Sequence, residues 1–390
     1  MKPTTPGPLP VVLAGARGHG RWHLTNIRRL ERLGLVTLAG ICELRPLDAE
    51  ELRGFGAPEQ SDDFAALLDS TDARIAVICT PIQTHTDLAL AAAARGVDIL
   101  LEKPPAASYA DFQRLTDGLR ETGGVCQIGF QSLGSHALTA IRELVADGGI
   151  GTVRGIGAAG AWVRDAAYYE RAPWAGRRSL DGVDVVDGVL TNPLAHAVTT
   201  ALALAGSERA EDVTGIETEL YRANDIEADD TSCVRVSTAC GIPVTVAVTL
   251  CAEQSREPYV VLHGDRGRIT LRYKDDHVLV QRAGHGPEEH VHGRTDLLEN
   301  LVEHLAGRAD LLAGPERTGA FMRVVEAVRL APAPALLPAS AWRTEPGESA
   351  PRRVVTGIDG LVAASADSLA LFSEMGAPWA RSAVTGAVAR

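Results

Sequence analysis

The first third of the chain alternates short apolar runs with helical patterns, and this alternation constrains the fold more than any other feature. Apolar runs cover residues 10–14, 36–42, 75–79, 97–101 and 125–130. One helical pattern has Leu24, Ile27 and either Leu30 or Leu33 on one face, and another covers 84–95 and ends before Gly96. Strands that are apolar on both faces and alternate with helices form parallel sheets covered by helices. The sequence therefore predicts an N-terminal α/β domain with a parallel sheet.

A different pattern begins after about residue 150. Strand-like runs, many of them alternating apolar with polar residues, cover 213–221, 232–238, 244–250, 259–263, 268–273 and 278–281. They predict a mostly antiparallel sheet with one face covered. Two helices are expected around 297–305 and 316–330, followed by a linker rich in Pro and Ala at 331–352. A last helical pattern then runs through Ile358, Leu361, Val362, Leu369 and Phe372.

The length of 390 residues is more than one ordinary hydrophobic core organises. We expect a parallel α/β domain at 1–131 and a second α/β domain with an open, mostly antiparallel sheet at 132–345. A C-terminal extension with one helix is expected at 346–390.

Composition narrows the possible partners. The formal net charge of −12 argues against nucleic acid or an anionic membrane. The six cysteines form no CxxC pair, so we expect neither a metal site nor a dense disulfide framework. The first residues lack the apolar region of a signal peptide, and no stretch has the length of a membrane span. A cytoplasmic protein is the default expectation.

A glycine-rich turn follows the first predicted strand and opens the first helix. In a dinucleotide-binding loop the backbone turns tightly at this point and approaches a pyrophosphate, which sits on helical N–H groups. The outer glycine positions of that motif are filled, but the middle one holds Arg17 with Gly18 beside it. The alternative is a turn that binds no ligand. The candidate cofactor residues here are Gly15, Arg17, Gly18, His19 and Gly20.

Glu43 ends the second predicted strand. A carboxylate at that position can hydrogen-bond both ribose hydroxyls and would repel a 2′-phosphate, which favours NAD while leaving NADP possible. Arg45 lies near enough in sequence to soften the preference. The alternative is a solvated loop carboxylate paired with Arg45.

Three further motifs carry a family resemblance. Thr80-Pro81 follows the strand that ends at Cys79, with His85 shortly after; Glu102-Lys103-Pro104-Pro105 follows the strand that ends at Leu101; and Asn192-Pro193-Leu194-Ala195-His196 lies near the middle of the chain. In this order and spacing they resemble the Gfo/Idh/MocA family of nicotinamide-dependent oxidoreductases, over roughly residues 10 to 330.

The resemblance implies a Rossmann domain, a second domain with an open sheet, NAD or NADP, and substrates that are sugars, polyols or their derivatives. It also implies a homodimer or homotetramer formed through the C-terminal sheet. The matching lysine in the family contacts the nicotinamide ribose and the substrate oxygen, so Lys103 would stabilise an oxyanion during hydride transfer. The remaining cofactor positions by this resemblance are Thr80, Pro81, His85, Glu102, Lys103 and Gln131.

His196 matches the family's catalytic histidine, which passes a proton to or from a substrate hydroxyl. Two departures from the family pattern weaken the expected proton transfer through His196. Asn192 stands where many members carry Asp, and Thr199 stands where an Asp is usual. Asn192 is either a substrate contact or only the N-cap of a helix with Pro193 as its first residue. That helix would run to about Ala205, with His196 lying away from its apolar stripe. Ile82 is a further departure, because the family often has Asn there. The polar contact to the cofactor is then either lost or supplied from elsewhere, as by Gln83 or Gln131.

Aromatic and basic residues are concentrated between Trp162 and Arg178. Aromatic faces beside polar groups suit a polyhydroxylated ligand, and the arginines could also indicate an acidic sugar or a phosphate. The alternative is a packed loop at a subunit contact. The candidate substrate residues are Tyr168, Tyr169, Trp174, Arg177 and Arg178. By contrast, His290 and His292 are interpreted as part of a solvated hairpin.

The leading hypothesis is an NAD(P)-dependent dehydrogenase or reductase acting on a hydroxyl or keto carbon of a sugar-like substrate. One alternative is an enzyme that oxidises a sugar transiently to allow elimination or glycosidic cleavage. Another is a non-catalytic sensor of nicotinamide or sugar.

Overall fold

A computed structural model describes residues 7–386, and the chain divides into two compact units. One runs up to Phe130 and also includes Thr295–Pro315. The other comprises Gln131–Arg294 and the chain from Glu316 onwards. The first unit is therefore built from two separate stretches of sequence.

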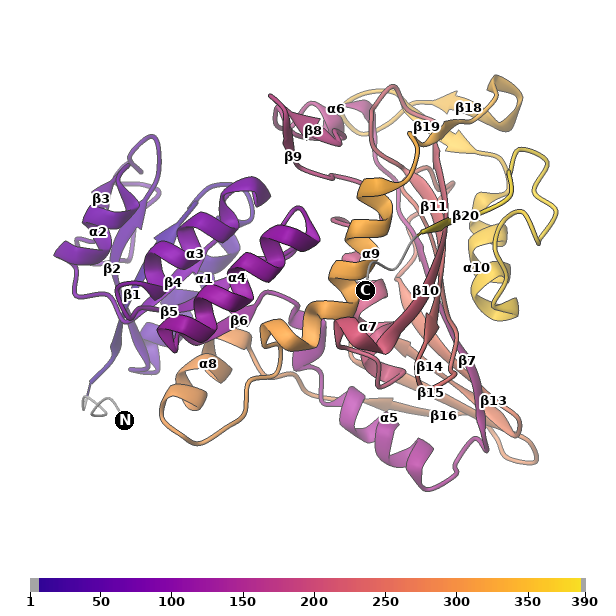
Figure 1. Ribbon diagram of the computed structural model, residues 1–390, viewed down its shortest axis with the longest axis horizontal. Coiled ribbons are helices and arrows are strands. Elements are labelled where there is room, and N and C mark those ends of the chain that lie inside the picture. The colour runs from indigo at the N-terminus through magenta and orange to yellow at the C-terminus, as the bar shows by residue number, and fades with distance from the viewer. Residues whose placement is uncertain (1–6, 387–390) are drawn as a thin grey trace. The chain divides into compact units, whose positions relative to one another are not determined.

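The first unit contains a six-stranded parallel sheet with the order β3-β2-β1-β4-β5-β6 (Figure 1). Its central strands are buried on both faces, as expected for a sheet covered by helices. The strand order reverses between β1 and β4, which is where such sheets place their ligands. The strands are β1 (Leu9–Ala14), β2 (Val36–Cys42), β3 (Glu59–Ser61), β4 (Ile75–Ile78), β5 (Asp98–Leu101) and β6 (Cys126–Ile128).

Helices α2, α3 and α4 pack side by side, whereas α1 pairs with α8 through hydrogen bonds from Asn26 to Asp296. The buried face of α1 carries Leu24, Ile27 and Leu30, while Leu33 lies beyond the helix and is exposed. The helices are α1 (Gly20–Arg32), α2 (Phe64–Ser70), α3 (His85–Ala93), α4 (Tyr109–Thr122) and α8 (Leu297–Leu305).

The second unit is organised around a sheet with the order β16-β15-β14-β13-β7-β12-β11-β10-β17, with β20 also pairing with β10. The pairs β7–β12 and β10–β17 are parallel, and the other pairs are antiparallel. The expected strands are present as β10 (Val213–Arg222), β11 (Thr231–Thr238), β12 (Val244–Thr249), β13 (Tyr259–Gly264), β14 (Gly267–Arg272) and β15 (His277–Arg282). The strands not expected are β7 (Val153–Ala161), β16 (Glu288–Val291), β17 (Ala335–Leu336) and β20 (Val384–Gly386).

The prediction that one face of this sheet is covered was wrong for its central strands. Helices α7 (Ala195–Leu204) and α9 (Gly319–Leu330) pack on one side and α10 (Ile358–Ser368) on the other (Figure 1). Every residue of β12 is buried as a result. Glycines of β7 let these helices lie close to the strand. A Cβ on Gly157 would lie 2.0 Å from the carbonyl oxygen of Ala366 in α10, and a Cβ on Gly160 would lie 2.8 Å from the Leu194 side chain at the start of α7.

The predicted linker is also structured. It contributes β17 to the sheet edge and forms the hairpin of β18 (Trp342–Glu345) and β19 (Arg352–Val355). The last helix, α10, ends before Leu369, so Leu369 and Phe372 follow it rather than belong to it. Phe372 and Trp379 pack on Tyr221, which joins the C-terminal segment to β10 in one apolar cluster.

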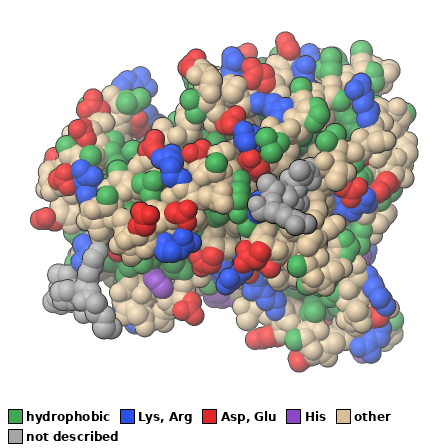
Figure 2. Space-filling model, viewed as in Figure 1, with side chains coloured by type: hydrophobic (Ala, Val, Ile, Leu, Met, Phe, Trp, Pro, Cys, Tyr) green, Lys and Arg blue, Asp and Glu red, His purple; other side chains and the backbone are tan. Residues whose placement is uncertain are grey.

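On the face shown in Figure 2, acidic and basic side chains are interspersed over both units. None of the helices within residues 7–386 is long and apolar enough to cross a bilayer. The six cysteines are all free thiols. Burial raises the pKa of the Cys42 thiol to about 11, consistent with a small packing residue at the end of β2.

Candidate functional site

The glycine turn between β1 and α1 has a backbone that only glycine accommodates at both ends. Gly15 has a φ of +83°, and a Cβ there would lie 2.5 Å from the carbonyl oxygen of Cys79. A Cβ on Gly20 would lie 1.9 Å from the carbonyl oxygen of Gly15. The Gly18 position has a φ of +57° and open space around it. The turn therefore brings backbone close to the point where the strand order reverses, as a pyrophosphate site requires.

Glu43 lies directly at this turn. One carboxylate oxygen accepts the Ala16 N–H at 3.0 Å, and the other accepts the Leu44 N–H at 3.1 Å. The cation that pairs with Glu43 is Arg17, whose Nη1 lies 3.9 Å from Glu43 Oε2. The pairing of Glu43 with Arg45, the alternative drawn from the sequence, is not the one formed. Arg17 also donates to the carbonyl oxygen of Arg45 at 2.7 Å. The residue in the middle glycine position thus braces the loop that follows β2.

Glu102 joins the end of β5 to the start of α1. Its Oε1 lies 2.9 Å from His23 Nε2 and 3.5 Å from His19 Nε2, and its Oε2 accepts the Lys103 N–H at 3.1 Å. Only glycine fits at position 129, because a Cβ there would lie 2.8 Å from Oε1. Burial raises the pKa of Glu102, but its hydrogen bonds with His19 and His23 outweigh burial and hold the pKa well below its usual range. Glu102 is thus an ionised anchor that fixes the backbone of Lys103.

The same three side chains could hold a metal ion. The ligand atoms of His19, His23 and Glu102 lie within 4.8 Å of one another, and the described residues contain no other such group. Their mutual contacts account for the arrangement, so we assign no metal to it. His23 was not singled out from the sequence, although its spacing of four residues from His19 on a helix puts both on one face.

His85 is buried and holds two loops together. Its Nδ1 lies 2.8 Å from the carbonyl oxygen of Pro104, and its Nε2 lies 2.8 Å from that of Thr80. Burial lowers the pKa of His85 even though both carbonyl contacts act in the opposite direction. The ring thereby connects the Thr80-Pro81 turn to the Glu102–Pro105 block. Thr80 in turn shares a hydrogen bond of 2.7 Å with Thr84.

In the second unit, His196 is the partly exposed residue of an otherwise buried helix, α7. A single apolar stripe was predicted for this helix, but it is buried nearly all round because it packs between the sheet and other helices. His196 Nδ1 lies 3.2 Å from Ser132 Oγ, and the Thr200 hydroxyl donates to the same Ser132 oxygen at 2.9 Å. Ser132 belongs to the short helix η2 (Gln131–Gly134), which begins at the candidate cofactor residue Gln131.

The interpretation of Asn192 as a helix cap was wrong, because α7 begins at Ala195 and its N-cap is Leu194. Asn192 Nδ2 instead donates to Asp187 Oδ1 at 2.6 Å. Asp187 Oδ2 accepts the Gly176 N–H at 2.7 Å and pairs with Arg171 at 3.0 Å. Asp187 is buried and lies in a loop, and no periodicity or motif in the sequence identifies it. A carboxylate thus lies next to Asn192, although position 192 itself, where many family members carry Asp, is not acidic in this chain.

The aromatic loop is packed around arginines. Arg171 lies over the rings of Tyr168 and Trp174, at 3.8 and 4.6 Å from their centroids. Arg178 donates to the backbone carbonyl oxygens of Val328, Arg329 and Ala331 near the end of α9, so its guanidinium is used structurally. Tyr169, Arg177 and Arg178 line a cavity in this unit, whereas Tyr168 and Trp174 are not among its lining residues. The expected substrate residues therefore do not all gather at one surface.

Comparison with known proteins identifies the class. The Oxidoreductase family, NAD-binding Rossmann fold, matches residues 9–130, so the first unit is an NAD-binding Rossmann domain of an oxidoreductase. The GFO/IDH/MocA C-terminal domain matches residues 138–270. The chain belongs to the Gfo/Idh/MocA family.

Individual relatives are more distant. A levoglucosan dehydrogenase of Pseudarthrobacter phenanthrenivorans is 27% identical over 43% of this chain, and the match spans 42% of that protein's length. A dTDP-3,4-didehydro-2,6-dideoxy-alpha-D-glucose 3-reductase of Streptomyces violaceoruber is 29% identical over 73% of this chain and 74% of its own. The WlbA dehydrogenase of Bordetella pertussis, crystallised with NADH and UDP-GlcNAcA, superposes with a TM-score of 0.67 at 20% identity, covering 82% of this chain and 95% of that one.

Proposed function

We propose that this protein transfers a hydride between NAD and a hydroxyl or keto carbon of a sugar, a polyol or a sugar derivative. The observation that carries the proposal is the Glu102 anchor in a chain of this family. A buried carboxylate, held by His23 of the first helix and by His19 at the N-cap of that helix, fixes the backbone of Lys103 at the end of a parallel strand. Open α/β sheets bind their ligands at that end.

Lys103 is proposed as the group that stabilises the substrate oxygen. An ammonium placed beside a carbonyl that accepts a hydride stabilises the negative charge that develops on oxygen. NAD would supply the hydride acceptor or donor, held by the turn from Gly15 to Gly20. The Glu43 carboxylate at this turn supports NAD rather than NADP, because a 2′-phosphate would meet a negative charge there.

His196 is proposed as the group that moves the substrate proton, with Asn192 as a substrate contact. Support comes from Ser132 Oγ, which lies 3.2 Å from His196 Nδ1, and from the Asp187 carboxylate that accepts a hydrogen bond from Asn192. Sugar-like substrates are favoured by the named activities of the two curated relatives. A homo-oligomer formed through the sheet of the second unit and a cytoplasmic location remain predictions from the sequence.

The test compares Lys103→Met with Lys274→Met, which removes an exposed lysine of the second unit. Oxidation of levoglucosan and a panel of sugars and polyols is followed by NADH absorbance, and NAD binding by titration. We expect Lys103→Met to lower kcat/KM about 100- to 1000-fold without unfolding the protein, and Lys274→Met to be unchanged. Equal activity of Lys103→Met and the parent protein would contradict the mechanism. Substrate consumption without stoichiometric NADH would instead indicate transient oxidation followed by elimination or cleavage.

A further inference from the structure

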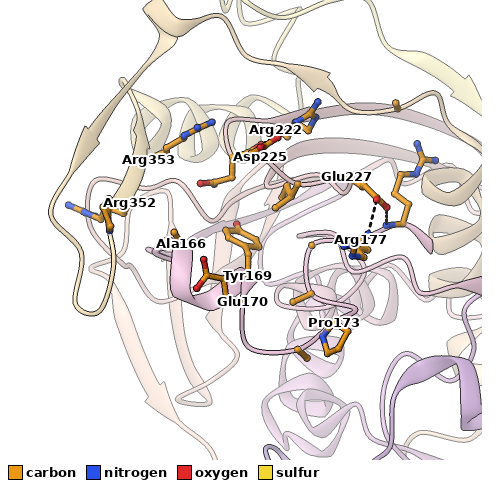
Figure 3. Close-up of a pocket in the computed structure, with 18 of the residues that line it drawn as sticks. Ala166, Tyr169, Glu170, Pro173, Arg177, Arg222, Asp225, Glu227, Arg352 and Arg353 are labelled. Carbon is orange, nitrogen blue, oxygen red and sulfur yellow. Dashed lines mark hydrogen bonds and ion pairs between the residues drawn. The ribbon is translucent and has the colours of Figure 1, made fainter. Parts of the chain in front are cut away.

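A cavity of about 1060 Å³ lies within the second unit, outside the residues proposed for catalysis. One wall is the loop that carries α6 (Ala166–Tyr169), and the opposite wall is the β18–β19 hairpin (Figure 3). Neither Asn192 nor His196 belongs to the residues that line it. The cavity is therefore a separate subsite that the reaction centre does not explain.

Arginines from three segments line this cavity. Arg177 comes from the loop, Arg222 from the end of β10, and Arg352 and Arg353 from β19 (Figure 3). The acidic residues facing them are Glu170, Asp225 and Glu227, so basic side chains outnumber acidic ones in a chain whose formal net charge is −12. A concave surface lined by one excess sign of charge concentrates ligands of the opposite sign.

Two of these arginines have donors to spare. Arg177 contacts Glu227 at 3.2 Å through Nη1 alone, and both partners are about half exposed, at 49% each. Arg222 donates from Nη1 to the carbonyl oxygen of Asn224 at 3.3 Å and approaches the fully exposed Asp225 only to 3.9 Å. Within residues 7–386, their Nε and Nη2 groups make no hydrogen bond. A guanidinium with two adjacent free donors matches a carboxylate or a phosphate in a bidentate manner.

An aromatic ring gives the cavity an apolar wall. Tyr169 stands in the middle of the lining in Figure 3, with arginines on both sides. Its hydroxyl is buried and finds no hydrogen-bond partner among the described residues. Burial first, and then the nearby Asp230, raises the pKa of this hydroxyl well above its usual range. The ring face is therefore what Tyr169 offers to a ligand, and aromatic faces cover the C–H faces of carbohydrates.

The C-terminal segment completes the cationic side of the cavity. Arg352 and Arg353 lie beyond residues 9–130 and 138–270, which match the family. Arg353 lies over the Trp342 ring, 4.3 Å from its centroid, and donates to the carbonyl oxygen of Ala223. Arg352 pairs with Glu345 at 2.6 Å. These contacts fix the hairpin against β10, so the cavity is a built feature of this chain.

One carboxylate connects the cavity to the reaction centre. Gly176 lines the cavity and donates its N–H to Asp187, and Asn192 donates its side chain to the same carboxylate. A ligand group that contacts Gly176 is thus connected to Asn192 through two residues, Gly176 and Asp187.

We propose that this cavity binds the anionic group of an acidic carbohydrate, a sugar acid or a sugar phosphate, as a subsite remote from the reacting carbon. That this ligand is the substrate rests on the proposed function, whereas anion binding does not. Arg177 and Arg222 would contact the anion, and Tyr169 would pack against the sugar ring.

The experiment measures binding of glucuronate, a glucose monophosphate and uncharged glucose by calorimetry at low salt. The double variant Arg177→Gln/Arg222→Gln is compared with Arg154→Gln, which removes an exposed arginine of the same unit. We expect the parent protein to bind one of the two anions at least about tenfold more tightly than glucose. The double variant should bind that anion no more tightly than glucose, whereas Arg154→Gln should bind it as the parent protein does. The anion that binds separates a sugar acid from a sugar phosphate. Equal binding of all three compounds, or an unchanged double variant, would overturn the proposal.

A second measurement separates this subsite from the proposed function. Lys103→Met should bind the preferred anion as the parent protein does while losing turnover. Anion binding without hydride transfer in the parent protein would uphold the cavity and reject the dehydrogenase. Turnover with only uncharged sugars and no anion binding would reject the cavity and uphold the dehydrogenase.

Discussion

At the scale of single residues, the hydroxyl pair beside His196 takes the place of carboxylates that the family usually supplies. Thr200 donates to Ser132 Oγ at 2.9 Å, and His196 Nδ1 lies 3.2 Å from the same oxygen. An imidazole that takes a substrate proton on Nε2 carries its own hydrogen on Nδ1, and the second lone pair of Ser132 Oγ can accept that hydrogen. We therefore expect Ser132 to act as a positioning residue that favours this tautomer of His196.

The first prediction concerns this pair. Ser132→Ala removes one hydrogen bond of about 1 kcal/mol and should lower kcat about five- to tenfold. The acidic limb of the pH–rate profile should move with it, because the imidazole loses a fixed partner. Thr200→Val should act in the same direction more weakly. Thr199→Val is the matched control, since within residues 7–386 the Thr199 hydroxyl donates to the Ala195 carbonyl oxygen of its own helix and to no other group. A pH profile that Ser132→Ala leaves unmoved would show that Ser132 has only a structural role.

Glu102 gives a prediction about pH and stability. Its pKa in the folded protein lies well below the ordinary value of 4.5, chiefly through its hydrogen bonds with His19 and His23 acting against burial. The unfolded chain therefore takes up this proton first as the pH falls, and the stabilisation is present above about pH 4.5 and lost at lower pH. Glu102→Gln should cost about 1–3 kcal/mol of unfolding free energy at pH 7. Urea unfolding at several pH values should show this cost shrinking below pH 4.5. A cost that grows as the pH falls would mean that the sign is wrong.

At the scale of elements, the sequence predicts what depends on local pattern. The strands β1, β2 and β4 and the turn that ends at Gly20 follow from apolar runs and glycine positions, and the structure has them there. Strand β7 was missed because its sequence is mostly Gly and Ala, which carry little strand propensity. Those small residues serve contacts with α7 and α10, which are distant in sequence. The start of α7 was misplaced because Asp187, a loop residue, binds the side chain of Asn192.

The packing of α10 on β7 gives a prediction at this scale. Gly157→Ala would put a methyl group 2.0 Å from the carbonyl oxygen of Ala366, so the helix must shift. We expect a loss of about 1–3 kcal/mol in unfolding free energy. Gly360→Ala is the control, because this position lies within α10 with nothing within 4 Å. Alanine there should stabilise the helix by about 0.5–1 kcal/mol. Thermal unfolding of both variants checks the pair, and equal effects would show that α10 does not pack tightly on β7.

At the scale of the whole molecule, motifs in the sequence single out candidate residues but not the partners that position them. Gly15, Glu43, Lys103 and His196 stand out in the sequence because they follow strands or match a family pattern. The residues that position such groups carry no motif, because only the folded chain brings them into contact. His23 contacts Glu102, Ser132 contacts His196, and Asp187 contacts Asn192. The arginine cavity likewise combines the loop after β7, the end of β10 and the C-terminal hairpin.

The covered sheet also restricts how two copies of this protein can associate. Helix α10 covers one face of β7 and β12, the face on which Gly157 lies. The strand pairing carries this face from Gly157 through Val261 to β14, β15 and β16. The residues of these last three strands in the same row are Thr270, Leu279 and Glu289. We therefore expect a homodimer formed through this sheet to use β14–β16. Val291, a strand residue 75% exposed on this face, would be buried there.

Val291→Asp should shift the protein towards monomer in sedimentation equilibrium. Leu330→Asp, at an exposed position on α9, is the control and should leave association unchanged. A parent protein that sediments as a monomer, or a Val291→Asp dimer of undiminished stability, would exclude this surface as the interface.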